Sequence, residues 1–351
     1  MLAGAGSRLP APRDHAYIPG LMSLYPERPT PPAGGLSRMH LTGINALSDD
    51  DLIFLLQLAQ YYRALMRDDL DIPLRLKGRT QVNLFFENST RTNCSFELAG
   101  KKLGADVIVV PVAASSVHKG EELQDTTQTL AAMGADAMVV RNKEHDTAEF
   151  VSSALGKAGI PCAVINAGEG TRSHPTQALL DAATMLESLG RTPDEGLKGI
   201  TVAICGDIRH SRVAGSNAEL LPRLGADVRF VGPEQLHPAA TQYGHVERYT
   251  SLDQGLAGCD FVMALRMQME RMEGGYGMTN EEYHASFGLT HETLGLAGQH
   301  AKVLHPGPMN RGIEISGALA DDRARSLILD QVAHGVTTRM AVLDALLTEQ
   351  E

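Results

Sequence analysis

Short continuous apolar runs alternate with longer segments of helical periodicity through most of the chain, and this alternation constrains the fold more than any other feature. Continuous apolar strands separated by helices are typical of parallel sheets that helices cover on both faces. The pattern therefore predicts an α/β protein made of two doubly wound parallel-sheet domains. Strands are expected at 81–86, 105–110, 135–140 and 161–166 in the first half, and at 199–207, 226–232, 260–266 and 301–308 in the second.

Helix-start and helix-stop signals agree with this alternation. Ser48 with Asp51 three residues later is typical of a capping box, and apolar residues then recur at helical spacing through Leu65. Gly104 and Gly134 stand where helices should end, because glycine adopts the left-handed conformation that closes a helix. Further helices are expected at 175–189, joining the two domains, at 211–224 and at about 322–348.

Composition narrows the class of protein. The 351 residues suffice for two domains, and the net charge of -11 argues against nucleic acid or an anionic membrane as the main partner. No apolar run approaches the ~20 residues of a membrane span, and residues 1–36, rich in Pro and Gly, lack the apolar core of a signal peptide. The four cysteines form no CxxC pair, which favours reduced thiols in the cytoplasm.

The stretch Ser89-Thr90-Arg91-Thr92 stands where the first predicted strand gives way to a helix. A helix N-terminus presents unpaired N–H groups and a partial positive charge, and both favour a bound anion. The hydroxyls add donors, and Arg91 adds a two-pronged donor suited to phosphate. An ordinary N-cap beside a solvated arginine is the alternative, but it would need only one of these hydroxyls. The stretch therefore predicts a phosphate site.

Polar side chains also follow the other predicted strands, at the edge where doubly wound sheets bind ligands. Each could instead belong to an exposed loop, a surface arginine or a structural histidine. The sequence contains no Walker loop, dinucleotide glycine fingerprint, HExxH motif or Ser-His-Asp order. The polar residues at the strand ends, and the absence of these motifs, together predict a site between the domains. Such a site would hold several negative charges without a metal, a cofactor or a covalent nucleophile. The candidates are Ser115, Ser116, His118, Lys119, Arg141, His174, Gln177, Asp207, Arg209, His210, Arg212, Arg266, Gln268 and His305 to Pro308.

These motifs, in this order, resemble the catalytic chains of the aspartate carbamoyltransferase family, within the wider aspartate/ornithine carbamoyltransferases. They are FFENSTRT, SSVHKGE, NAGEGTRSHPTQ, GDIRHSR, ALRMQMER and LHPGPMNRGIEI, and the resemblance runs from about residue 38 to 347. It implies transfer of the carbamoyl group from carbamoyl phosphate to the α-amino group of L-aspartate, in pyrimidine biosynthesis. It also implies a carbamoyl-phosphate-binding domain at 37–182, with the C-terminal segment 327–351 packed back on it, and an aspartate-binding domain at 183–326.

The resemblance further implies a role for each site residue. Ser89, Thr90, Arg91 and Thr92 would hold the phosphate, while Thr92, Arg141 and His174 would polarise the carbamoyl oxygen. Gln177 and the carbonyls of Gly307 and Pro308 would hold the carbamoyl nitrogen. Arg212, Arg266 and Gln268 would bind aspartate, and Lys119, with Ser115 or Ser116, would enter from a neighbouring subunit of a homotrimer, with possible regulatory or dihydroorotase chains beyond it.

Three other readings remain to be weighed against this resemblance. An ornithine carbamoyltransferase usually shows a cysteine where this chain has His305-Pro306, and Arg266 would repel the cationic ornithine side chain. A non-catalytic scaffold or regulator should have lost members of the motif set, and none is missing. A nicotinamide dehydrogenase is disfavoured because the glycine fingerprint is absent.

Overall fold

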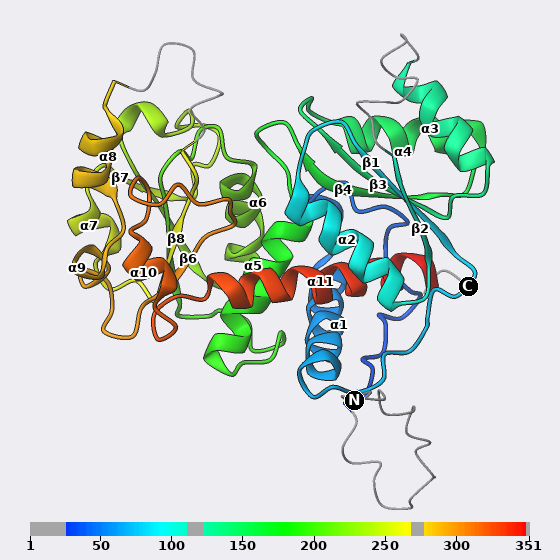
Figure 1. Cartoon of the computed structure of the whole chain (residues 1–351), viewed down its shortest axis with the longest axis horizontal. Coiled ribbons are helices and arrows are strands. Elements are labelled where there is room, and N and C mark those ends of the chain that lie inside the picture. The colour runs from blue at the N-terminus through cyan, green and yellow to red at the C-terminus, as the bar shows by residue number, and fades with distance from the viewer. Residues whose placement is uncertain (1–25, 111–121, 268–276, 349–351) are drawn as a thin grey trace, which may run out of the picture.

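The computed structural model describes residues 26–110, 122–267 and 277–348. Two parallel sheets form two lobes, and helices α5 and α11 run between them (Figure 1). The first sheet has the strand order β2-β1-β3-β4 and the second the order β7-β6-β5-β8-β9. The strands are β1 Thr80–Phe85, β2 Asp106–Val110, β3 Ala137–Asn142, β4 Ala163–Glu169, β5 Thr201–Cys205, β6 Asp227–Val231, β7 Glu247–Tyr249, β8 Phe261–Ala264 and β9 Lys302–Leu304.

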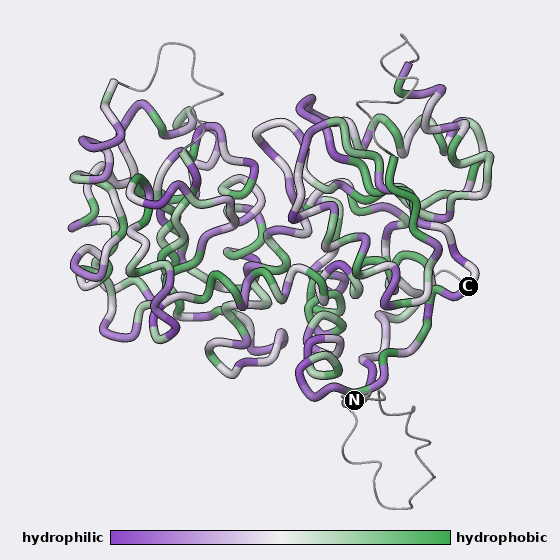
Figure 2. Tube along the Cα trace, viewed as in Figure 1, coloured by the Kyte–Doolittle hydropathy of each residue, from purple (hydrophilic) through white to green (hydrophobic). Residues whose placement is uncertain are grey.

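Helices cover both faces of the first sheet, as the continuous apolar strands predict. Val139 of β3 faces one core, whereas its neighbours Met138 and Val140 face another, so successive side chains are buried on opposite sides. Figure 2 shows the strands of this sheet as largely hydrophobic. The helices are α1 Asp49–Arg67, α2 Thr90–Lys102, α3 Leu123–Ala132, α4 Thr147–Ala158, α5 Pro175–Leu189, α6 Arg212–Leu220, α7 Leu252–Leu256, α8 Asn280–Phe287, α9 His291–Leu294, α10 Gly317–Asp321 and α11 Ile328–Thr348.

All eight predicted strands are present, and most element boundaries lie within a few residues of prediction. Ser48 caps α1 in a capping box with Asp51, as expected. The predicted helix 211–224 is wrong at its end: α6 stops at Leu220 and a 3-10 turn follows from Pro222, because proline has no N–H to continue the helix. The start predicted near 322 for the last helix is also wrong, since α10 ends there and α11 begins at Ile328.

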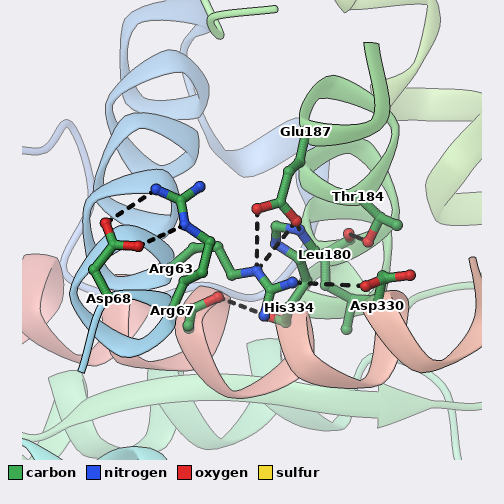
Figure 3. Close-up of polar contacts among 9 residues, drawn as sticks. Arg63, Arg67, Asp68, Leu180, Thr184, Glu187, Asp330 and His334 are labelled. Atoms are coloured by element: carbon green, nitrogen blue, oxygen red, sulfur yellow. Dashed lines mark hydrogen bonds and ion pairs between the residues drawn. The ribbon is translucent and has the colours of Figure 1, made fainter. Parts of the chain in front are cut away.

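Helices α1, α5 and α11 share one polar cluster (Figure 3). Arg63 of α1 donates to Glu187 of α5 at 3.1 Å, and His334 of α11 contacts the same carboxylate at 2.7 Å. Arg63 also lies 3.7 Å from Asp330 of α11. The hydrogen bond from His334 and the charge of Arg63 lower the pKa of Glu187 to about 2. The last helix is thereby tied to α1 and to the helix that links the two sheets.

Candidate active site

A cleft of about 750 Å³ opens where the carboxyl ends of β1, β3, β8 and β9 meet the starts of α2, α5 and α6. Ligands of doubly wound proteins bind at this edge. Most of the predicted site residues that the structure describes line this one cleft, namely Ser89, Thr90, Arg91, Thr92, Arg141, His174, Gln177, Arg212, Arg266 and His305 to Pro308. Asp207, Arg209 and His210 were also candidates, but they are not among its lining residues. Lys119 and Gln268, with Ser115, Ser116 and His118, lie outside the described residues.

The N-terminus of α2 forms one end of the cleft. Ser89 is the N-cap of α2, yet its side chain makes no capping hydrogen bond. The hydroxyl is therefore not used to cap the helix and can donate to a ligand. Among the described residues, no carboxylate pairs with Arg91, and burial lowers the pKa of its guanidinium. Four N–H groups of a helix start, three hydroxyls and a guanidinium thus converge where an anion would be stabilised.

The loop 305–308 closes over this end of the cleft. Gly307 has a φ of +72°, and a Cβ added there would lie 2.6 Å from the guanidinium carbon of Arg91. Only glycine lets the loop backbone approach the arginine so closely. His305 accepts the N–H of Gly307 at Nδ1, 2.8 Å away, and its Nε2 lies 3.1 Å from Glu314, which fixes the neutral tautomer with the proton on Nε2. The Gly307–Pro308 peptide bond is cis.

Arginines from both lobes meet at Glu87, two residues after the end of β1. Arg212 of α6 donates to the Glu87 carboxylate at 2.7 Å, and Arg141 at the end of β3 lies 3.6 Å from it. Arg141 also donates to the carbonyl of Ala167 at 3.0 Å. Gly168, with a φ of +111°, lies beneath both guanidiniums. The side chain of Arg212 is only 6% exposed, so this pair is largely desolvated.

His174 is the N-cap of α5, with Pro175 at the first helical position. Its backbone N–H donates to the hydroxyl of Ser216 at 2.8 Å, and its buried Nδ1 has no hydrogen-bond partner among the described residues. Burial, followed by the charges of Arg141, Arg339 and Arg212, lowers the pKa of His174 well below its usual value. The imidazole is therefore neutral at neutral pH and can donate one hydrogen bond without carrying charge.

The lining carries a strong cationic excess. Five arginines, Arg91, Arg141, Arg212, Arg266 and Arg339, face a single carboxylate, Glu87, among the described lining residues. Arg339 of α11 is 3% exposed and lies over the ring of Phe96 at 5.0 Å. Burial, followed by the charge of Arg141, lowers its pKa to about 9. A protein of net charge -11 thus concentrates positive charge where two anions could be held together.

Glu87, Gln331 and Arg339 line the cleft although the sequence analysis assigned them no role. Glu87 follows a predicted strand, the same signal that identified Arg141. Gln331 and Arg339 stand in the last helix, where a polar residue in a mostly apolar segment is a signal for burial with a partner. Gln331 and Arg339 were not predicted as site residues because they lie outside all the quoted motifs.

No helix in the described ranges is long and apolar enough to cross a membrane. Nor do three or more metal-binding side chains gather anywhere in the part of the chain that the structure describes.

Two family models match the chain in tandem. Residues 39–187 match the carbamoyl-phosphate-binding domain of aspartate/ornithine carbamoyltransferases, and residues 198–346 match their Asp/Orn-binding domain. The aspartate carbamoyltransferase catalytic subunit of Methylorubrum populi is 52% identical over 309 residues, which are 88% of this chain and 95% of that protein. That of Sphingopyxis alaskensis is 48% identical over 327 residues, 91% of each chain.

Solved structures agree with these sequence matches. A Trypanosoma cruzi aspartate transcarbamoylase in complex with carbamoyl aspartate and phosphate superposes with a TM-score of 0.78 at 30% identity, covering 92% of this chain and 99% of that one. The ornithine carbamoyltransferase of Gloeobacter violaceus gives a TM-score of 0.71 at 25% identity, covering 88% of this chain and 99% of that one. The chain belongs to the aspartate/ornithine carbamoyltransferase family.

Proposed function

We propose that this chain is the catalytic subunit of an aspartate carbamoyltransferase, which transfers the carbamoyl group of carbamoyl phosphate to the α-amino group of L-aspartate in pyrimidine biosynthesis. The observation that carries the proposal is the convergence of five arginines, one neutral histidine and one helix N-terminus on a single cleft between the two sheets. Relatives that match about nine-tenths of the chain at about half identity bear this name.

Carbamoyl phosphate would bind at the end of the cleft formed by α2. Ser89, Thr90, Arg91 and Thr92 would hold its phosphate, and Thr92, Arg141 and His174 would donate to the carbamoyl oxygen. The amine attacks the carbonyl carbon, a C–N bond forms, and negative charge grows on that oxygen. Preorganised donors aimed at such charge are worth roughly 10²–10³-fold in rate each. The C–O bond to phosphate then breaks, and the departing phosphate takes the proton of the amine.

L-aspartate would bind at the other end of the cleft, with its carboxylates on Arg212 and Arg266 and with Gln268 beside them. Glu87 already occupies Arg212 and faces Arg141, so a substrate carboxylate would share or replace this contact. Two anions held in one cationic cleft form an entropy trap that contributes ~7–11 kcal/mol. Ornithine carries a cationic side chain, which Arg266 would repel. The arginine at this end therefore favours aspartate as the acceptor.

One assay tests the proposal. The purified chain is supplied with carbamoyl phosphate and either L-aspartate or L-ornithine, and phosphate release is measured with and without EDTA. We expect release with aspartate alone, undiminished by EDTA. Release with ornithine, or a need for a divalent ion, would overturn the assignment of the acceptor or of the metal-free site.

We also propose the domain arrangement that the family implies: carbamoyl phosphate on residues 37–182 with the last helix packed against them, and aspartate on 183–326. The contacts of α11 with α1, α2 and α5 support this division. The chain would work in the cytoplasm as a homotrimer, into which regulatory or dihydroorotase chains could assemble. Lys119, with Ser115 or Ser116, would reach the site of the neighbouring subunit, in a ring of closed symmetry.

Mixing two inactive variants tests the shared site. Lys119→Ala and Arg91→Ala homotrimers should each be nearly inactive. Refolding them together should restore activity, because some interfaces then pair an intact Arg91 with an intact Lys119 from the next chain. Separately refolded variants are the control. Activity at the control level in trimers shown to be mixed would mean that each site belongs to one chain.

A further inference from the structure

Asp181 of α5 is a completely buried carboxylate directly behind the cleft. Three side-chain amides from three helices converge on it. Gln177, one turn earlier on α5, lies 2.8 Å from its Oδ1, and Gln331 of α11 lies 2.6 Å from the same oxygen. Asn217 of α6 lies 2.8 Å from Oδ2. Only Gln177 and Gln331 of this group also line the cleft.

The partners of two of these amides fix which way they point. The backbone N–H of His305 can only donate, and it lies 2.9 Å from Oε1 of Gln331, so the NH₂ of Gln331 faces Asp181. The carbonyl of Val213 can only accept, and it lies 3.0 Å from Nδ2 of Asn217, which likewise turns its NH₂ to Asp181. Asp181 therefore receives donors on both oxygens, as an ionised carboxylate requires.

The same requirement fixes Gln177. A carboxylate offers Gln177 only an acceptor, so its NH₂ must face Asp181 and its carbonyl oxygen must face the cleft. We propose that Asp181 is a positioning residue, which holds the Gln177 oxygen toward the substrate and so makes the site select acyl phosphates that carry an NH₂ group. The inference rests on the proposed function, in which Gln177 contacts the carbamoyl nitrogen.

The hydrogen bonds of Asp181 also extend to the loop whose carbonyls, those of Gly307 and Pro308, would face the carbamoyl nitrogen. Gln331 joins Asp181 to the backbone of His305, at the start of the loop that carries the Gly307 and Pro308 carbonyls. One carboxylate thus organises an amide oxygen and a loop of carbonyls, all acceptors. The NH₂ of a carbamoyl group can donate hydrogen bonds to these acceptors. The CH₃ of an acetyl group has the same shape but donates none, so it would leave the acceptors without hydrogen bonds.

The protonation state of Asp181 suits this role. Burial raises its pKa to about 6, while the amides of Asn217, Gln331 and Gln177 oppose that rise. The carboxylate therefore predominates at pH 7 and above, where it can only accept. A neutral side chain at this position would offer a donor as well, and Gln177 could then turn its NH₂ to the cleft.

The test compares carbamoyl phosphate with acetyl phosphate as ligands at pH 8, by their dissociation constants and by KM and kcat with aspartate. In Asp181→Asn, we expect the preference for carbamoyl over acetyl phosphate to fall about tenfold or more, the effect of about one lost hydrogen bond. The loss should lie in the constants for carbamoyl phosphate, with those for acetyl phosphate little changed. Asp344→Asn is the matched control, since Asp344 is equally buried but accepts from Tyr62 and Arg28, outside the cleft.

A double-mutant cycle separates positioning from general damage. Gln177→Ala should lower the preference, and adding Asp181→Asn should then lower it much less than it does in the wild-type background, because Asp181 acts mainly through Gln177 and otherwise only through the loop behind Gln331. Asp181→Ala, which leaves room for water among the three amides, replaces Asp181→Asn if that variant does not fold. A folded variant with the full preference, or an additive effect in the Gln177→Ala background, overturns the inference. A wild-type protein without any preference would instead overturn the proposed function.

Discussion

Replacing Gly168 by alanine should damage catalysis through two arginines at once. Gly168 has a φ of +111°, and an added Cβ would lie 2.7 Å from Nη1 of Arg141 and 3.1 Å from Nη1 of Arg212. Ordinary contacts of a Cβ begin at 3.4 Å, so the Arg141 guanidinium must retreat by about 0.7 Å, which is 3.4 minus 2.7. Its hydrogen bond to the carbonyl of Ala167 opposes that movement.

The expected loss of activity follows from this displacement. A shift of about 1 Å in a group that positions the reacting atoms can cost about 10²-fold in rate. We therefore expect kcat/KM to fall about 10–100-fold, which corresponds to ~1.4–2.7 kcal/mol of transition-state stabilisation. The backbone adds a separate cost of ~1–3 kcal/mol in the free energy of unfolding, because alanine is strained at this φ.

Gly190→Ala separates the two effects. Gly190 also has a positive φ, +65°, at the end of α5, but nothing lies within 4 Å of an added Cβ. This variant should lose stability alone. Steady-state kinetics with both substrates and urea denaturation of each variant provide the measurements. Wild-type kcat/KM in a folded Gly168→Ala protein, or equal losses of activity in both variants, would refute the reasoning.

Three further experiments test the separate roles of Arg91 and Arg266, the contribution of the Glu187 cluster to stability, and the closure of the two lobes. Arg91→Ala should abolish binding of carbamoyl phosphate in calorimetry while Arg266→Ala retains it, since a charge-assisted hydrogen bond contributes ~1.5–3 kcal/mol; equal losses would contradict the division of roles. His334 and Arg63 lower the pKa of Glu187 to about 2, below its unfolded value, so they stabilise the fold fully above about pH 4.5 and lose this effect as the pH falls toward 2. The stability advantage of the wild type over Glu187→Gln in urea denaturation should therefore shrink from pH 6 to pH 3, and a constant advantage would exclude the ion pair as its source. A bisubstrate mimic with a phosphonate and two carboxylates should draw the two lobes together and reduce the radius of gyration in small-angle scattering, whereas an unchanged radius at saturation would count against closure.

Local patterns in the sequence determined the elements and the residues that follow them. A strand of continuous apolar residues and a helix with a capping box are each specified within about ten residues, so β1, α1 and α5 lie where they are predicted. The cationic residues that follow the predicted strands could also be identified from the sequence, because parallel strands bring their carboxyl ends to one edge of the sheet. The start of α11 was predicted about six residues too early. The three-residue strand β7, which pairs with β6 at the edge of its sheet, carries too little periodicity to be recognised.

Only the tertiary structure decided which of these side chains are partners. Glu87 and Arg212 are 125 residues apart in sequence, and Asp181 and Gln331 are 150 apart, so no local period relates them. Their pairing depends on how α5, α6 and α11 pack between the two sheets. Burial then sets their chemistry, because it keeps His174 neutral and raises the pKa of Asp181. The sequence thus determined which groups stand at the ends of the strands, and packing determined which way they point and what charge they carry.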